Sequence, residues 1–391
     1  MMSVAKALLV LCGLVILLKQ PWYASSQRAF PAQRTVVAVL LALAGLALTL
    51  LWTEASLAEA AQSLGKRSKL LVIPMLLLLI RNQREAMLAL GAFFIAQLFL
   101  LASSWLLVLH LPVPWATNPA TDTDYAVFST YLDQSIMSCV VAALCWHLRE
   151  LTHRPLLRAL ALLTVILALT NAVFAMQGRT GHMVAIVLIT LAVMWALPTR
   201  WRIAALLAPV LLVMGMYGTS SRFHDRFNAV ATETSAFSDA GNNDTPSGER
   251  LNYWHRSLQA IAERPLYGFG VGSWNAQYRR LDAGRGAPHT LQIRNPHQEF
   301  LLWGVEAGLG GIVLLCYLLF AACKDALSMP LPVRHAVHSV VAALIVACCF
   351  NSSLFDGAIG DFFCVTLGLL LALGWQSRHQ PHSISRAKTT P

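Results

Sequence analysis

Long apolar runs recur along nearly the whole chain and alternate with short polar segments. Runs of this kind are typical of membrane-spanning helices, which need about 20 apolar residues to cross the ~30 Å hydrocarbon core. The pattern therefore predicts an all-α, polytopic membrane protein with 11–12 transmembrane helices. The candidate spans are 4–18, 35–52, 70–80, 86–109, 135–148, 156–176, 182–197, 203–217, 299–321, 336–350 and 358–375.

Composition agrees with a membrane protein and excludes an ordinary soluble domain. Hydrophobic residues make up 57% of the chain and charged residues 12%, against about 25% charged in a typical soluble domain. The first run resembles a signal-peptide core, but no small-residue cleavage site follows it, so we expect a retained helix. The eight cysteines lie in or beside apolar runs without metal-ligand spacing, so they predict neither a disulfide framework nor a zinc site.

Lysine and arginine in the short loops predict the orientation of the chain in the membrane. The loops assigned to the cytoplasm carry Arg81 and Arg84; Arg149, Arg154 and Arg158; Arg200 and Arg202; Lys324 and Arg334; and Arg378, Arg386 and Lys388. The segments assigned to the opposite side are 110–134, 177–181, 218–298 and 351–357. Lys66, Arg67 and Lys69 do not fit, because alternation puts their loop outside. The N-terminal topology stays open between 11 and 12 spans.

These assignments divide the chain into four parts. Residues 1–217 form an N-terminal transmembrane helix bundle, 218–298 one large outer loop, 299–376 the C-terminal transmembrane helices, and 377–391 a cytoplasmic tail. The large loop has nine arginines, seven acidic residues and no lysine. Guanidinium groups bind phosphate bidentately and stay charged in any environment. Two interpretations remain open: a phosphate-bearing ligand on the outer face, or a solvated basic loop.

Arginines stand at two positions that favour an anion. In QGRTGH, residues 177 to 182, two glycines allow a tight turn that places Arg179 at the outer membrane surface. There Arg179 either binds an anion or snorkels to the interface. Apolar residues at helical spacing predict an amphipathic helix over about 248–262, with Arg250 in its first turn. A cation there is unfavourable unless an anion also approaches the helix N-terminus.

Three glycines, Gly268, Gly270 and Gly272, follow this helix in a G-x-G-x-G pattern. The pattern is not a dinucleotide-binding fingerprint, because Ser273 follows and no β-α-β pattern surrounds it. We expect a turn or close backbone packing here.

The stretch NPHQEF, residues 295 to 300, leads into a predicted span. Its spacing predicts Asn295 as N-cap, Pro296 at the first helical position, His297 at the second and Gln298 at the third. A helix N-terminus disfavours imidazolium, so His297 should be biased towards its neutral form and available as a base. The alternative is a plain helix cap. Likewise, Asp356 in NSSLFDG either orients an arginine or contacts sugar hydroxyls, or belongs to a simple polar turn.

Together these motifs resemble the O-antigen ligases and, more widely, the O-antigen ligase/polymerase superfamily. The family's histidine motif is His, then Asn, Ser or Gln, nine further residues, and Gly-x-x-(Gly/Thr/Tyr). Here it reads His297, Gln298, nine residues, Gly308, two residues, Gly311. The outer turn GRTG and the loop GERLNYWHRSLQAIAERPLYGFGVGSW add to the resemblance, which is strong over about 177–311 and topological elsewhere.

The resemblance implies a GT-C-like fold and a metal-independent, inverting glycosyltransferase without cofactors. It implies transfer of an O-antigen glycan from undecaprenyl pyrophosphate onto lipid A–core oligosaccharide, with no nucleic acid as partner. The chain is expected in the bacterial inner membrane, with the large loop and the active site on the periplasmic side. The catalytic positions of the family map to His297, Arg179 and Arg250. Arg264, Tyr253, Gln298 and Asp356 are weaker candidates for binding the substrate.

Chemistry is consistent with that assignment. The glycosyl–pyrophosphate bond is already activated, so the enzyme must mainly stabilise the departing pyrophosphate and position the acceptor. Two arginines can do so without a metal, and the outer loop has no Asp-x-Asp string; the one at 122–124 lies in another loop, and we treat it as incidental.

Three alternatives remain. An O-antigen polymerase or a protein O-oligosaccharyltransferase would share the donor and differ in the acceptor. A transporter of lipid-linked or anionic solutes would instead place ionisable residues and broken helices near the bilayer midplane.

Overall fold

The computed structural model describes residues 32–221, 245–283 and 293–379, with scattered positions between 222 and 244. Over these residues the regular secondary structure is entirely helical, which confirms the all-α prediction. Seven helices are long and apolar enough to span a membrane, which confirms a polytopic membrane protein. They are α2 with the turn that follows it (Gln33–Leu51), α5 (Gln83–Val108), α8 with its end (Pro155–Ala175), α9 (Arg179–Ala196), α14 (Glu299–Ala326), α15 (Leu331–Phe350) and α16 (Gly357–His379, apolar to Ser377).

The other predicted spans have different outcomes. The run at 135–148 lies in α7 (Tyr131–Leu148), which is helical but more polar at its start. The runs at 70–80 and 203–217 form the shorter helices α4 (Val72–Leu79) and α10 (Ala208–Thr219). The run at 4–18 lies outside the described residues, as do most of the predicted tail and three loop arginines, Arg222, Arg226 and Arg285.

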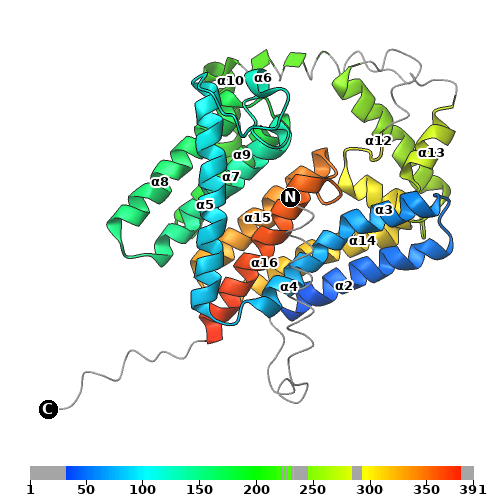
Figure 1. The fold of residues 1–391 in the computed structure, drawn as a ribbon, viewed down its shortest axis with the longest axis horizontal. Helices are drawn as coiled ribbons and strands as arrows, with labels where there is room; N and C mark the ends of the chain where they lie inside the picture. The colour runs from blue at the N-terminus through cyan, green and yellow to red at the C-terminus, as the bar shows by residue number, and fades with distance from the viewer. Residues whose placement is uncertain are drawn as a thin grey trace.

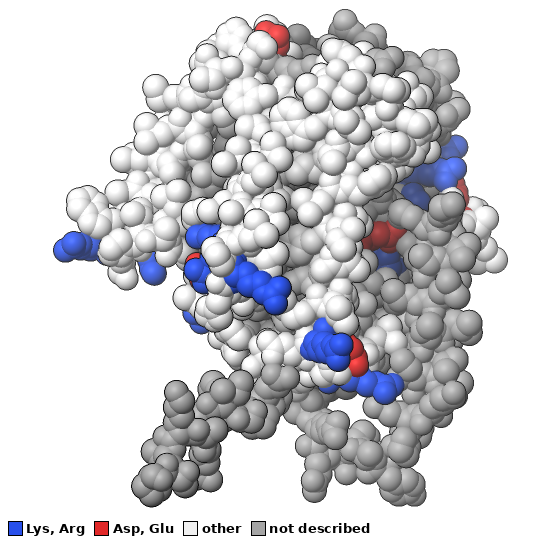
Figure 2. All heavy atoms as spheres, turned by 60° about the vertical axis from the view of Figure 1, so that its left-hand side comes forward, with Lys and Arg blue, Asp and Glu red and all other residues white. Residues whose placement is uncertain are grey.

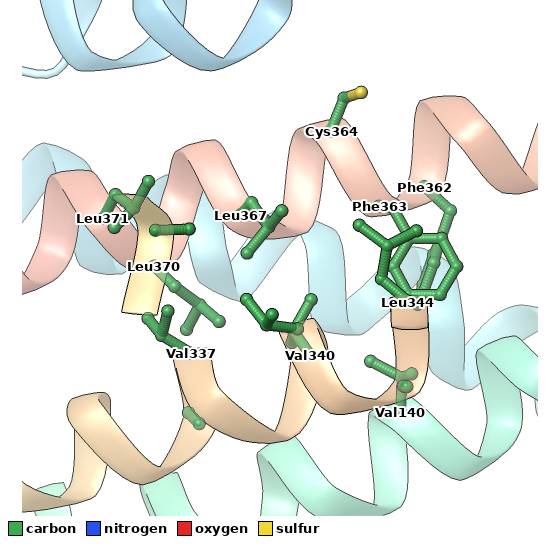
Figure 3. Close-up of a cluster of buried hydrophobic side chains, with 14 of the residues drawn as sticks. Val140, Val337, Val340, Leu344, Phe362, Phe363, Cys364, Leu367, Leu370 and Leu371 are labelled. Atoms are coloured by element: carbon green, nitrogen blue, oxygen red, sulfur yellow. The ribbon is translucent and has the colours of Figure 1, made fainter. Parts of the chain in front are cut away.

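Helix α16 occupies the centre of the bundle (Figure 1). Of the most apolar stretch of α16, 78% is buried inside the protein, against 28% for α5 and for α8. Helices α5 and α8 therefore lie on the outside of the bundle. Val337, Val340 and Leu344 of α15 face α16 beside Val140 of α7 (Figure 3). Leu and Val side chains packed in this way exclude water and lipid from the core. Helices α7, α15 and α16 therefore share a tightly packed apolar core.

The outer helices present apolar side chains to the surroundings. Leu156, Leu163 and Ile166 of α8 are exposed. On the face shown in Figure 2, most of the surface carries no charged side chain, and lysine and arginine gather mainly towards the lower part of the view. An exposed apolar band of this kind is stable in lipid and not in water.

Helices α2 and α14 lie antiparallel and define the two ends of the bundle. Asp325, near the end of α14, accepts hydrogen bonds from the backbone N–H and the hydroxyl of Thr35, both at 2.8 Å. At the opposite end of α2, the Thr49 hydroxyl accepts from the N–H of Val271 at 2.8 Å. We call these the Asp325 end and the His297 end, because His297 directly precedes α14.

The segment after α2 explains the three basic residues that did not fit the loop pattern. Helix α3 (Leu57–Arg67) lies at the His297 end, beside α14 (Figure 1), and the chain then returns through α4. Ile80, directly after α4, accepts a hydrogen bond from Gln376 near the end of α16, at 3.0 Å. Lys66, Arg67 and Lys69 therefore lie at the same end as His297, where Arg67 and Lys69 have buried partners described below.

Two helices of the large loop cover the His297 end. Helix α12 (Pro246–Glu263) contains the segment interpreted as an amphipathic helix, begins with Thr245 as its N-cap and ends before Pro265. Helix α13 (Trp274–Leu281) packs against it through Trp274, whose indole donates to the hydroxyl of Ser257 in α12 at 2.8 Å. Both helices lie on the same side of the bundle (Figure 1).

Helix α14 contains the predicted span at 299–321 but is broken at Ala307 and Gly308, whose φ and ψ are not helical. The loop 265–270 fills the break: Phe269 and Gly270 donate their N–H groups to the carbonyls of Val305 and Glu306, at 2.8 and 2.9 Å. In return Pro265 accepts from the N–H of Leu309 at 2.7 Å. The break is stable because neighbouring backbone satisfies the N–H and carbonyl groups that it frees.

The glycines of the G-x-G-x-G pattern allow this docking, as expected from the sequence. Gly268, Gly270 and Gly272 have φ of 66°, 90° and 84°, a region that side chains rarely adopt. A side chain at Gly268 would collide with the backbone of residues 305–307. Gly268 therefore lets the large loop dock on α14, while Gly270 and Gly272 lie against Thr53 and Ala60.

Candidate functional site

Arg179 joins α9 to α12 at the His297 end. It is the first residue of α9, after Gly178, and its Nη1 donates to the hydroxyl of Ser247 at 2.7 Å. Gly178 and Gly181 both lie against Ser135 of α7, so that any side chain at either position would collide with it. The glycines thus bring the start of α9 close to α7 and hold Arg179 at the start of α12.

Arg250 is the fifth residue of α12, just beyond the first turn in which the sequence placed it, because the helix begins at Pro246 and not at about 248. Burial lowers the pKa of its guanidinium, and the positive charge of Arg179 lowers it further. An arginine nevertheless remains charged at any physiological pH. Two like charges beside a helix N-terminus repel each other and attract an anion. Arg179 and Arg250 therefore concentrate positive charge near the start of α12.

His297 precedes α14 and does not belong to it, so the prediction that Asn295 caps this helix is wrong. Helix α14 begins at Glu299, and its N-cap is Gln298, whose side-chain oxygen accepts from the N–H of Leu301 at 2.5 Å. His297 has φ of 51°, which no helix position allows. Asn295 instead accepts the N–H of His297 at 2.9 Å, which closes a tight turn before the helix.

The histidine ring is oriented by Asn351, the residue that follows α15. Nδ1 of His297 lies 3.1 Å from Oδ1 of Asn351. Because an amide oxygen only accepts hydrogen bonds, Nδ1 carries the hydrogen and Nε2 has the lone pair. Burial lowers the pKa of His297, the positive charge of Arg250 lowers it further, and Asn351 and Asp356 oppose the shift. Burial, and not the helix terminus, is therefore the main reason why the neutral form of the ring is favoured.

The turn at His297 is fixed from two further directions. Asn295 donates through its side-chain amide to Asp356 at 3.3 Å, and the indole of Trp254 donates to the carbonyl of Pro296 at 3.0 Å. Burial raises the pKa of Asp356, while His297, Lys66 and Lys69 oppose the shift. Asp356, which the sequence offered as a weaker candidate, thus lies within electrostatic reach of His297.

Two buried side chains, Glu299 and Lys69, hold the loop that carries Asn351 and Asp356 in place. Neither was among the candidates predicted from the sequence. One carboxylate oxygen of Glu299, a fully buried residue, accepts the N–H groups of Leu354 and Phe355 at 2.9 and 3.2 Å. The ammonium of Lys69 donates to the carbonyls of the same loop, at 2.5 Å for Asp356. The one signal in the sequence was the basic loop at 66–69, which violated the charge alternation.

The remaining candidates, Tyr253, Gln298 and Arg264, lie at different distances from His297. Tyr253 is buried, its ring centroid lies 6.3 Å from that of His297, and its hydroxyl has no hydrogen-bond partner among the described residues. Gln298 serves as the helix cap. Arg264 ends α12, pairs with Glu54 at 2.6 Å and lies over the ring of Phe269, so the structure does not bring it to His297.

Comparison with known proteins gives two matches. A family model described as O-antigen ligase matches residues 160–316, a stretch that includes Arg179, Arg250 and His297. An uncharacterised protein of Haemophilus influenzae is 26% identical over 155 residues, which make up 39% of this chain and 39% of that relative. The matched region thus spans about two fifths of either chain.

Proposed function

Because this chain belongs to the O-antigen ligase family through the domain at residues 160–316, we propose that it is a glycosyltransferase of the bacterial inner membrane. It transfers an O-antigen glycan from undecaprenyl pyrophosphate to the lipid A–core oligosaccharide. The observation that carries the proposal is the convergence of a neutral histidine with two arginines: Arg250 is within electrostatic reach of both Arg179 and His297. This combination matches a reaction that needs a base and a charged leaving group.

Each residue has a role in one displacement. Nε2 of His297 takes the proton from the attacking hydroxyl of the core sugar. The sugar oxygen forms its bond to the anomeric carbon of the glycan while the bond to pyrophosphate breaks, from the opposite side, so the configuration inverts. The electron pair leaves with the pyrophosphate, whose added charge Arg179 and Arg250 stabilise. Both substrates are lipid-linked and enter laterally from the bilayer.

The side of the membrane follows from the basic loops. Arg81, Arg149, Arg200 and Arg334 belong to the loops that the charge rule places in the cytoplasm. In that orientation the His297 end faces the periplasm. Asp325, next to Lys324, then lies at the cytoplasmic end.

The break in α14 does not favour a transporter. The helix beyond the break, 309–326, has a length of about 27 Å at ~1.5 Å per residue, nearly enough to cross the hydrocarbon core alone. Glu306, beside the break, is paired with the buried Arg67 at 2.6 Å. The break therefore lies close to the membrane surface, where it anchors the large loop.

Deletion of the gene in its host, followed by electrophoresis of lipopolysaccharide, tests the proposal. We expect core without O-antigen, with lipid-linked polymer accumulating, and no rescue by His297→Ala, Arg179→Ala or Arg250→Ala at normal expression. His255→Ala, a histidine of α12 that contacts Gln259, is the matched control and should restore the full ladder. A core that carries a single repeat would instead identify a polymerase. Full ladders from all three variants would contradict the site assignment.

A further inference from the structure

A cavity lies at the His297 end, on the same side of the bundle as His297, Arg179 and Arg250. Its volume is about 370 Å³, and it is enclosed by α3, α13, the break in α14 and the two loops that carry the site. Arg294 lines it three residues before His297, and Phe355 lines it directly before Asp356. His297, Arg179 and Arg250 do not line it. A cavity of this size lies at the small end of the ~300–1,000 Å³ range of ligand pockets.

The charged side chains that line this cavity are of both signs, unlike those at Arg179 and Arg250. Two arginines, Arg279 and Arg294, face two carboxylates, Glu59 and Glu306. Glu59 is within electrostatic reach of both arginines, and Glu306 is already paired with the buried Arg67. Each of these four charged side chains already has a partner within the protein. The cavity therefore suits a neutral ligand that both donates and accepts hydrogen bonds.

The polar groups of the walls are held in place before any ligand binds. Arg294 donates to the side-chain oxygen of Gln62 at 2.9 Å. Arg279 donates to the side-chain oxygen of Asn275, whose amide in turn donates to the carbonyl of Ile293. Amide and guanidinium groups fixed in this way present donors and acceptors at set positions, as sugar hydroxyls require.

The floor of the cavity is rigid and partly apolar. The Glu306 carboxylate accepts from the N–H of Gly272 at 2.8 Å and from the hydroxyl of Ser63 at 3.2 Å, so this buried group has its partners. Phe355 is buried and adds a small apolar patch to the floor, with the ammonium of Lys66 3.9 Å from its ring centroid. Fixed polar groups with a small apolar patch suit the hydroxyls of a pyranose.

We propose that this cavity binds one neutral, hydroxyl-rich sugar unit of a substrate and so positions that substrate beside His297. The inference rests on the proposed function, because only a glycosyltransferase would bring such a sugar here. The sugar belongs either to the acceptor core or to the donor glycan, which share this chemistry. The phosphate groups of the donor bind elsewhere, at Arg179 and Arg250.

Adjacent arginines of α13 supply a matched pair of variants. Arg279 lines the cavity, whereas Arg280 pairs with Glu263 and lies over Phe269, outside the cavity. In Arg279→Ala a wall group is lost, and in Gln62→Trp an exposed wall residue fills the space. The full-length protein in nanodiscs is assayed with each lipid-linked substrate varied while the other is saturating. We expect about a tenfold rise in one of the two KM values for both variants, a nearly unchanged kcat, and wild-type values for Arg280→Ala.

The substrate whose KM rises identifies the source of the sugar. Unchanged KM values in both Arg279→Ala and Gln62→Trp would overturn the proposal, as would an equal rise in Arg280→Ala. A binding measurement that needs no turnover separates this failure from failure of the proposed function. Soluble core oligosaccharide and soluble O-antigen repeat are titrated into the wild-type protein and Gln62→Trp, with binding read by calorimetry. Binding of one of them that Gln62→Trp abolishes supports the cavity even if transfer to lipid A–core is absent, and equal binding to both proteins contradicts it.

Discussion

Asn351 fixes the tautomer of His297: its side-chain oxygen lies 3.1 Å from Nδ1 of the ring, so that Nε2 keeps its lone pair. The two residues are 54 positions apart in the chain and come from the end of α15 and the turn before α14. A base that is held in one orientation spends no free energy on reorientation in the transition state. Asn351 acts through His297 and is a positioning residue.

Replacing Asn351 tests this role. Asn351→Ala should lower kcat by about 10- to 100-fold, because the ring loses its preferred tautomer and direction. Asn351→Asp should recover part of that loss and also raise the pKa of His297, since it adds a negative charge next to the ring. The measurement is the pH profile of kcat/KM for glycan transfer. A purely structural role would leave the acid limb of Asn351→Asp where the wild type has it.

The wild-type enzyme should remain active below the usual pKa of histidine. Burial lowers the pKa of His297, and the neutral ring is the base. The fraction in the neutral form therefore stays high as the pH falls past ~6.5, the ordinary value, and drops only at lower pH. Rates of glycan transfer measured from neutral to acidic pH check this. An acid limb centred above pH ~6.5 would contradict it.

Arg250 should affect both the rate and the acid limb. Arg250→Gln removes a charge that stabilises the leaving pyrophosphate, and we expect a loss of about 10²- to 10³-fold in kcat. The same change removes a positive charge that lowers the pKa of His297, so the acid limb should move to higher pH. Arg250→Lys keeps the charge and should leave the limb in place. Identical limbs for the Gln and Lys variants would show that Arg250 does not act on His297.

The break in α14 can be tested with two neighbouring glycines. Gly308 has φ of 63°, and a side chain there would meet the backbone of Leu266. Gly308→Ala should cost about 1–3 kcal/mol of stability and detach the large loop from α14, with loss of transfer. Gly310→Ala is the control, because its nearest neighbour, the carbonyl of Leu266, is 3.7 Å from the added carbon. Thermal unfolding in detergent distinguishes them, and equal Tm values would contradict the assignment.

Helix content and membrane character follow from the sequence alone, because they depend on contiguous segments. The apolar runs at 86–109, 336–350 and 358–375 correspond closely to α5, α15 and α16. Residues 248–262 fall within α12 for a similar local reason, since Thr245 and Pro265 mark its two ends. The nearness of Arg250 to Arg179 and to His297 was suggested only by the family motif. No rule on sequence spacing predicts that these three distant segments meet.

Only the tertiary structure decided the rest, because it depends on hydrogen bonds between segments far apart in the chain. The N–H of Phe269 stabilises the break in α14. Asn295 begins a turn where a cap was predicted, because its side chain accepts the N–H of His297 and donates to the carboxylate of Asp356. Lys69 faces inward because the carbonyls of residues 355–357, 286 positions or more away, need a donor. Local propensity determines where a helix can form. Which end carries the histidine, and in which tautomer, is set by partners that the local sequence does not contain.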